Sequence, residues 1–159
     1  MRIGITGHCN LTAASMHLVQ RALADELEAL RGAEVTGVSC LAKGADQIFA
    51  SAVLEIGGAL EVVLPAADYR ERKVEPDNAA GFDELIGKAA TVRTMPFAAS
   101  SRTAYMAASE FLLDSVEAVI AVWDGRPSGG HGGTGAVVEA AHRRGVPVTV
   151  LWPEGAERA

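Results

Sequence analysis

Short apolar runs alternate along the chain with longer stretches in which apolar residues recur at helical spacing. Six apolar runs predict buried strands, at residues 2–7, 33–40, 60–65, 91–95, 117–123 and 147–152. The helical pattern predicts helices at residues 13–31, 44–58, 78–89, 100–115 and 132–144. In the first of these, Val19, Leu23 and Leu27 form one stripe, and Thr12 is a suitable N-cap. Residues 66–76 are polar and predict an irregular connection.

This order of elements predicts the fold class. Continuous apolar strands that alternate with amphipathic helices are typical of a parallel sheet with helices on both faces. With right-handed crossovers, the expected fold is α/β: a doubly wound, Rossmann-like three-layer sandwich with a mainly parallel sheet of about six strands. The chain has the length of one domain, so we expect residues 1–159 to form a single domain. Ligands of such folds bind outside the carboxyl ends of the strands.

Composition narrows the class of protein and of partner. A hydrophobic fraction of 49% and a charged fraction of 21% are typical of globular proteins. The net charge is −6 and the Lys and Arg residues are scattered, so we do not expect nucleic acid as a partner. No apolar run has the length of a membrane span, and no signal peptide pattern precedes the first strand. We therefore expect a cytoplasmic protein without a membrane partner.

The two cysteines, Cys9 and Cys40, do not have the spacing of metal ligands or of a redox pair. We accordingly expect no metal site and no resident cofactor. Cys9 as a nucleophile is disfavoured, because no partner base is identifiable from the sequence.

The loop "TGHCNLT" (6–12) follows the first predicted strand. Gly7 permits a tight turn and a close approach of a ligand to backbone amides, while His8 and Asn10 offer side-chain hydrogen bonds. The alternative is a plain turn followed by a helix cap.

The loop "LAKGADQ" (41–47) follows the second predicted strand. Gly44, Ala45 and Asp46 open a helix, with Lys43 alongside, so this segment is suited to present amides and a cation to a phosphate. The alternative is that Asp46 is only a first-turn carboxylate, favoured by the helix dipole.

A glycine-rich stretch follows the fifth predicted strand. Gly132, Gly133, Thr134 and Gly135 lead into the last helix, and successive glycines at a helix start are suited to form a nest of amide groups for a phosphate. The stretch is neither a P-loop nor the GxGxxG fingerprint. Asp124 stands at the carboxyl end of the preceding strand, where a polar ligand contact is expected.

Three further charged residues are candidates near this edge. Arg102 and Arg126 are suited to neutralise an anion, although surface arginines are common. Glu139 lies about one turn inside the last helix and is the candidate catalytic residue; the alternative is a glutamate on a solvated helix face.

Several segments together resemble the SLOG superfamily of Rossmann-like domains, which includes the DNA-processing protein A and the lysine-decarboxylase-like (LOG) proteins. The segments are "GITGHCNL", "SCLAKGADQIFASAVLEIGGALEVVLP", "DSVEAVIAVWDG" and "GGTGAVVEAAHRRGVPVTVLWP". The resemblance implies a ligand site at the strand ends for nucleotides or nucleotide-derived molecules, with the glycine-rich loops holding phosphate and sugar.

The enzymes of this superfamily are phosphoribohydrolases with the signature GGxGTxxE. Gly132, Gly133, Gly135 and Glu139 match that signature, but Ala136 replaces its threonine. The arginine that the enzymes carry on the helix before the preceding strand is missing from "AYMAASEFLLDS".

The sequence therefore predicts a domain that binds a nucleotide, a ribose phosphate or an ADP-ribose-like ligand, for example as a sensor. One alternative is an N-glycosidase that acts on nucleoside monophosphates, and a second is a non-catalytic scaffold related to DNA processing. A homodimer or higher homo-oligomer is a further expectation, because the apolar segment "AYMAASEFLL" can pack against a second subunit or against its own sheet.

Overall fold

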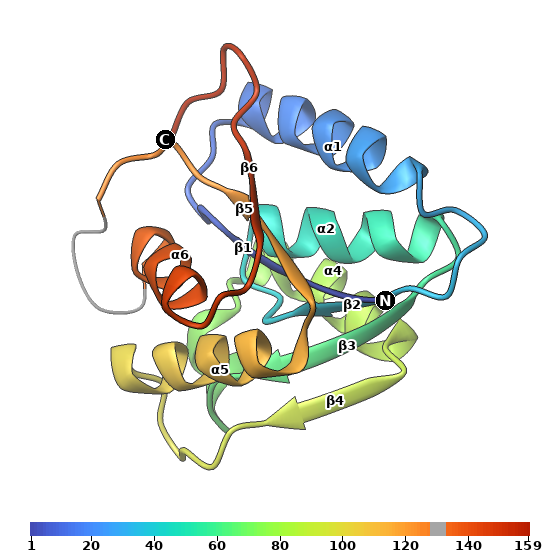
Figure 1. Ribbon diagram of the computed structural model, residues 1–159. Helices are drawn as coiled ribbons and strands as arrows, with labels where there is room; N and C mark the ends of the chain where they lie inside the picture. Colours follow the sequence, from blue (N-terminus) through green and yellow to red (C-terminus); the bar gives the residue numbers. More distant parts are fainter. Residues whose placement is uncertain (128–132) are drawn as a thin grey trace.

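The computed structural model describes residues 1–127 and 133–159, and it contains one central sheet covered by helices (Figure 1). The strands are β1 (Arg2–Gly7), β2 (Thr36–Ser39), β3 (Ala59–Leu64), β4 (Thr91–Thr94), β5 (Ala118–Val122) and β6 (Val148–Leu151). The helices are α1 (Ala13–Glu28), α2 (Ala45–Glu55), α3 (Tyr69–Lys73), α4 (Pro76–Lys88), α5 (Arg102–Ser115) and α6 (Thr134–Arg143).

The six strands of the described residues form a single sheet in the order β4-β3-β2-β1-β5-β6. Every pairing is parallel, and the strand order reverses at β1, which pairs with both β2 and β5. The α/β class and the doubly wound, Rossmann-like sheet that the sequence predicts are thus confirmed.

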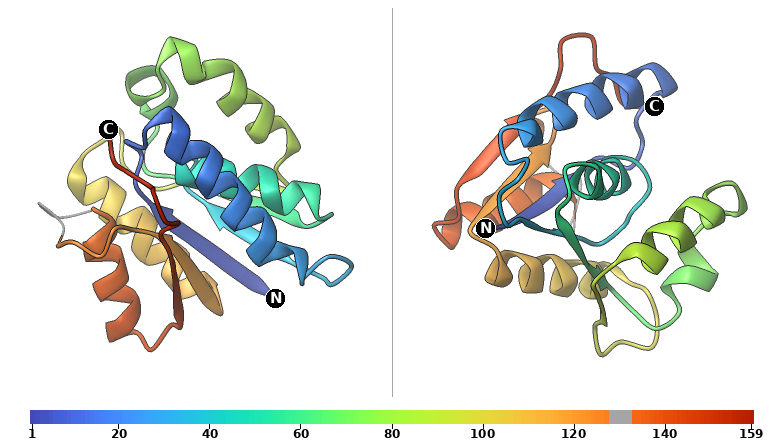
Figure 2. Two further views of the ribbon diagram at one scale, coloured as in Figure 1. Left: turned by 90° about the horizontal axis from the view of Figure 1, so that it is seen from above. Right: turned by 90° about the vertical axis from the view of Figure 1, so that its right-hand side faces the viewer.

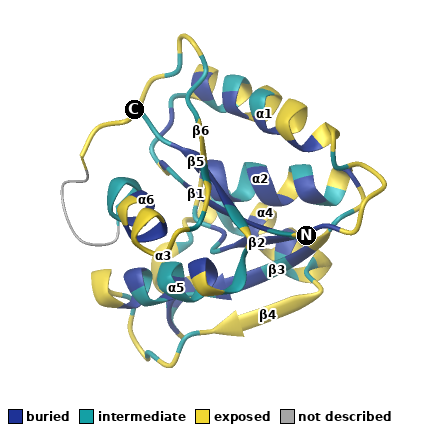
Figure 3. Ribbon diagram, in the orientation of Figure 1, coloured by how far each residue is buried: buried dark blue, intermediate teal, exposed yellow. Residues whose placement is uncertain are grey.

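Helices cover the two faces of the sheet in separate layers (Figure 2). α1, α2 and α4 lie on one face, and α5 and α6 lie on the other. The sequence of β3 shows why both faces are apolar: Val62 packs toward α2 and α4, whereas the next residue, Val63, packs toward α5. The edge strand β4 is exposed along its whole length (Figure 3).

Local sequence signals place several helix ends. Thr12 caps α1 as predicted, since its hydroxyl accepts a hydrogen bond from the Ser15 amide at 3.1 Å. α1 ends at Glu28, three residues earlier than predicted. In the described residues, no helix is both long enough and apolar enough to cross a membrane.

The prediction of an irregular connection at residues 66–76 is wrong in part, because α3 forms there. Tyr69 of α3 is buried against Phe82 and Tyr105, with ring centroids 6.2 Å away in both cases. This tertiary packing stabilises a short helix of about one and a half turns, which the polar sequence of the segment does not predict.

The apolar side of α5 packs against its own sheet. Met106, Leu112 and Leu113 are buried in one cluster with residues of β5 and α6. The apolar positions of "AYMAASEFLL" therefore have an intramolecular explanation, and an oligomer stays a prediction.

The end of β1 is in unusually close contact with its neighbours. A Cβ atom added at Gly7 would lie 2.5 Å from the Ala45 Cβ atom of α2 and 2.9 Å from the Val122 Cβ atom of β5. Only a glycine allows these three elements to meet, and their meeting places the loops after β1, β2 and β5 side by side.

We predict that Gly7→Ala lowers the free energy of unfolding by about 2 kcal/mol or more, because neither neighbouring Cβ atom can move without shifting its backbone. Gly81→Ala is the matched control: Gly81 lies inside α4, and outside its own turns of helix no atom lies within 4 Å of the new Cβ, so the substitution should leave stability unchanged or raise it by up to about 1 kcal/mol. Urea denaturation measures both. Equal effects of the two substitutions would contradict the close packing of β1.

Candidate functional site

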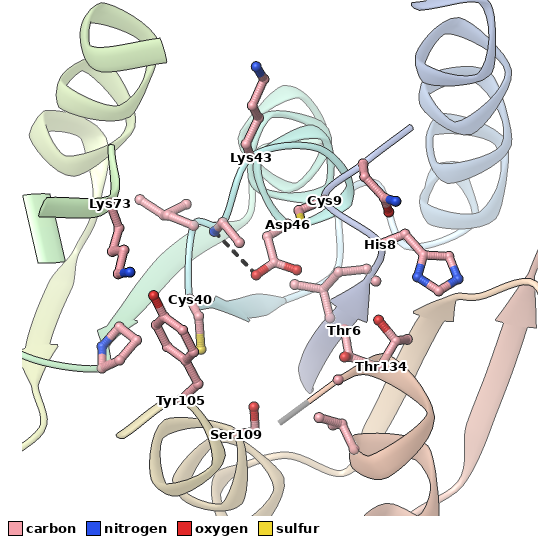
Figure 4. Close-up of a pocket in the computed structure, with 18 of the residues that line it drawn as sticks. Thr6, His8, Cys9, Cys40, Lys43, Asp46, Lys73, Tyr105, Ser109 and Thr134 are labelled. Carbon is pink, nitrogen blue, oxygen red and sulfur yellow. Dashed lines mark hydrogen bonds between the residues drawn. The ribbon is translucent and has the colours of Figure 1, made fainter. Parts of the chain in front are cut away.

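A cleft of about 700 Å³ lies at the carboxyl ends of the strands (Figure 4). Its walls come from the loops that follow β1, β2, β3 and β5, from α5 and from the first turn of α6. Its volume is in the range of sites that hold a small organic molecule. The location agrees with the rule that ligands of doubly wound sheets bind at the point where the strand order reverses.

Most of the residues that the sequence predicts for a ligand site line this cleft. They are Gly7, His8, Asn10, Lys43, Asp46, Arg102, Arg126, Gly133, Thr134 and Gly135. Gly132, which was also predicted, lies outside the described residues. α6 begins at Thr134, so Gly133 and Gly135 stand at its amino end as expected.

Gly44 and Ala45 are not among the residues that line the cleft. Gly44 has a φ of +92°, and an added Cβ atom would lie 2.8 Å from the carbonyl oxygen of His8. The Ala45 amide donates to that same oxygen at 3.4 Å. The structure thus shows these two residues joining the second loop to the first.

Asp124 is also absent from the lining, and it joins three segments instead. Its Oδ1 accepts a hydrogen bond from the Arg126 amide at 3.0 Å and lies 3.3 Å from His8 Nε2. Its Oδ2 lies 3.8 Å from Arg158 Nη1. Asp124 therefore holds three segments together: its backbone amide donates to His8 Nε2 of the first loop, and its carboxylate contacts the loop after β5 and the end of the chain.

Glu139 projects from α6 outside the residues that line the cleft. Its side chain is 73% exposed and forms an ion pair with Arg143, one helical turn further on, at 3.2 Å. In this position it has the surroundings of a solvated helix face, and its catalytic role stays a prediction.

Asp46 is the buried carboxyl group of the cleft. It is 7% exposed, and its Oδ2 accepts a hydrogen bond from the Ala42 amide at 3.3 Å. The carboxyl group points toward the interior of the cleft (Figure 4). Burial raises its pKa from the ordinary 3.8 to about 7, although the Ala42 amide opposes the shift. Burial, with a smaller effect of Asp46, also raises the pKa of the Cys40 thiol, so Cys40 is a neutral part of the wall.

His8, on the first loop, is buried and is held from several directions. Its Nε2 accepts a hydrogen bond from the Asp124 amide at 3.2 Å, and its ring meets the Trp152 ring edge to face at 5.6 Å. Burial and then the Arg158 guanidinium lower the pKa of His8, against the opposing effect of Asp124. His8 is therefore a neutral hydrogen-bonding group at neutral pH.

Positive charge gathers in the cleft of this acidic chain. Among the described residues the lining contains five basic side chains, Lys43, Lys73, Arg102, Arg126 and Arg158. It contains only two acidic ones, Asp46 and Glu75. Because the chain as a whole carries a net charge of −6, this local excess of cations favours an anionic ligand.

Sequence reasoning missed several residues of the lining, among them Lys73, Tyr105, Ser109, Trp123 and Arg158. Lys73 follows β3, and the rule that loops after strands form the site would have found it. Tyr105 and Ser109 lie one turn apart on α5, and nothing in their spacing distinguishes them from surface residues. In the described part of the chain, no group of three His, Cys, Asp or Glu side chains is arranged to hold a metal ion.

No protein-family model and no curated protein sequence matches this chain. Solved structures do resemble it. DNA processing protein A from Streptococcus pneumoniae has a TM-score of 0.67 at 19% identity over 94% of this chain and 49% of the other. The same protein from Helicobacter pylori has a TM-score of 0.70 at 19% identity, covering 99% and 68%. The Moco carrier protein of Chlamydomonas rheinhardtii has a TM-score of 0.54 at 14% identity, covering 94% and 74%.

These likenesses confirm the Rossmann-like fold that the sequence predicts, a fold shared with DNA processing protein A. The chain spans about half the length of the Streptococcus pneumoniae protein. At such low identities the comparison defines the class of fold and does not assign an activity.

We predict that Asp46→Asn stabilises the protein, and that the effect depends on pH. In the unfolded chain the carboxyl group has its ordinary pKa of 3.8, whereas in the folded chain the pKa is about 7. The folded state therefore binds more protons between these values, and stability falls as pH rises through this window, reaching a constant lower level above about pH 7. The neutral amide keeps the Ala42 contact without the burial of a charge.

Thermal unfolding measures the effect. The Tm of Asp46→Asn should exceed that of the parent protein by at least about 2 °C at pH 8, and the difference should shrink toward pH 4. Asp25→Asn is the control, because Asp25 is an exposed aspartate on α1. A gain for Asp46→Asn that is the same at both pH values would contradict the raised pKa.

Proposed function

We propose that this chain binds an anionic, nucleotide-like molecule, a nucleotide or a ribose phosphate, in the cleft at the carboxyl ends of its strands. The observation that carries the proposal is the charge of the cleft: five of the chain's 14 Lys and Arg residues line it, in a chain of net charge −6. This excess of cations stands at the edge where such folds bind ligands, and it therefore favours an anionic ligand there.

The amino end of α6 supports a phosphate position. Gly133 to Gly135 line the cleft there, and the first amides of a helix carry partial positive charge with no intrahelical partner. Arg126, from the loop after β5, also lines this cleft. A phosphate at the amino end of α6 would therefore bind to amides, with basic side chains adding charge.

The remainder of the cleft is suited to a sugar and a base. A carboxyl group such as Asp46 does not face a phosphate favourably, but it pairs well with a sugar hydroxyl or an exocyclic amino group. Tyr105 and Trp123 line the cleft as partly exposed aromatic side chains, which are surfaces for stacking a base. These features together support a nucleotide over a simple inorganic anion.

The proposal covers binding and assigns no reaction. An N-glycosidase on this scaffold would need Glu139 at the substrate, and the exposure of its side chain and its ion pair with Arg143 support a surface role more strongly. We therefore place the recognition of the ligand, and not its cleavage, at this site.

Single-stranded DNA is the second candidate ligand. The Helicobacter pylori protein that resembles this chain has a described mode of binding single-stranded DNA. The basic side chains of the cleft would bind the backbone phosphates of DNA as well as they would bind the phosphate of a mononucleotide.

We predict that AMP, ADP or ADP-ribose raises the Tm of the protein and that adenosine, which has no phosphate, does so much less. Isothermal titration then gives the affinities. Arg102→Gln should weaken AMP binding by about fivefold or more, because it removes a charged contact in the cleft. Arg21→Gln, on the exposed side of α1, is the matched control and should change nothing. If millimolar concentrations of these nucleotides produce no stabilisation, the proposal is wrong.

Fluorescence anisotropy with an oligo-dT distinguishes the second candidate. Single-stranded DNA bound by several cations should lose affinity steeply with salt, with a slope of log K against log [salt] of about −0.7 for each phosphate contact. An oligonucleotide that competes with AMP and is weakened by Arg102→Gln would support DNA as the ligand of the same cleft. No binding at low salt would exclude it.

A further inference from the structure

The C-terminal strap, residues 152–159, lies across the first loop. The Thr12 amide donates to the carbonyl oxygen of Glu157 at 3.2 Å, and the Ala159 amide donates to the carbonyl oxygen of Asn10 at 2.6 Å. Two backbone hydrogen bonds in opposite directions thus join the strap to the loop in a short antiparallel bridge. The loop that carries His8 and Asn10 is consequently clamped on its outer side by a segment from the other end of the chain.

Two further contacts fix the strap. The Glu157 amide donates to Ser15 Oγ at 2.7 Å, and Ser15 is 1% exposed. Trp152, at the start of the strap, packs against the His8 ring. The strap is therefore held to α1 and to the first loop by backbone, side-chain and aromatic contacts together.

The docked strap places Arg158 in the wall of the cleft. Its Nε donates to Asn10 Oδ1 at 3.1 Å, and its Nη1 lies 3.8 Å from Asp124 Oδ2, beyond the distance of a good hydrogen bond. The side chain is 45% exposed and lines the cleft. Since a guanidinium group has five N–H donors, these two contacts leave most of its donors available to a ligand.

We propose that Arg158 is an anion-binding residue of the cleft, positioned by the C-terminal strap, so that ligand binding and docking of the strap strengthen each other. This inference rests on the proposed function, because it assumes that a phosphate-bearing ligand occupies the cleft. Asn10 and the strap backbone position the guanidinium group, and a phosphate gives it a closer and stronger partner than Asp124 does. By linkage, whatever holds the strap in place raises the affinity for the ligand, and the ligand in turn holds the strap.

The first test uses AMP and adenosine as probes on the full chain. Arg158→Gln should weaken AMP binding by about tenfold or more and leave adenosine binding unchanged, because only the charged ligand loses a partner. Arg158→Lys keeps the charge but lacks the fork of donors, so its affinity for AMP should fall between those of the parent protein and Arg158→Gln. Arg143→Gln is the control, since that arginine pairs with Glu139 on the exposed face of α6 and should leave both affinities as they are.

Hydrogen exchange tests the coupling to the strap. Saturating AMP should slow exchange of the Thr12 and Glu157 amides severalfold in the parent protein and not in Arg158→Gln. The outcomes separate the two proposals. If the parent protein binds none of the nucleotides, both are overturned. If it binds AMP, and Arg158→Gln binds AMP equally well or shows the same slowing of exchange, only the role of Arg158 and its strap is overturned.

Discussion

The contact on which the rest of the structure depends is the one at the end of β1. There Gly7 packs against Ala45 of α2 and Val122 of β5 at distances that leave no room for a side chain. The strand order also reverses at β1, so the crossover helices on its β2 side and those on its β5 side lie on opposite faces of the sheet. The loops that leave β1, β2 and β5 are forced toward one edge, and the cleft is the space between them.

The charge of the cleft at that edge depends on which side chains the fold brings there. Cations reach it from the second loop, α3, α5, the loop after β5 and the end of the chain, and no two of them are close in the sequence. The same convergence buries Asp46, whose charged form is disfavoured by loss of water. Asp124, His8 and Arg158 form the joint that keeps the first loop in place beside this charge. The proposed ligand site is thus a product of the sheet topology more than of any single motif.

The prediction from sequence was strongest where local patterns are strong. The strand predicted at residues 2–7 has the same ends as β1, and Thr12 caps α1 as predicted. Both predictions succeed because an apolar run and a helix cap each depend on residues that are close together in the sequence. Prediction was weaker where a partner distant in sequence decides the outcome. α3 exists because Tyr69 finds Phe82 and Tyr105. Glu139, which the signature singles out, projects to solvent, whereas Asp46, which has a plain first-turn explanation, is buried with its carboxyl group toward the cleft.

The sequence by itself determined the succession of strands and helices, the parallel character of the sheet and the edge at which its glycine-rich loops gather. Those properties depend on residue spacing and on backbone freedom, which are set locally by short stretches of the sequence. Only the tertiary structure decided which charged side chains share the cleft, how far the pKa of Asp46 is raised, and that Arg158 belongs to the site at all. Burial and electrostatic potential are sums over groups that are distant in sequence, so they exist only when the fold has brought those groups together.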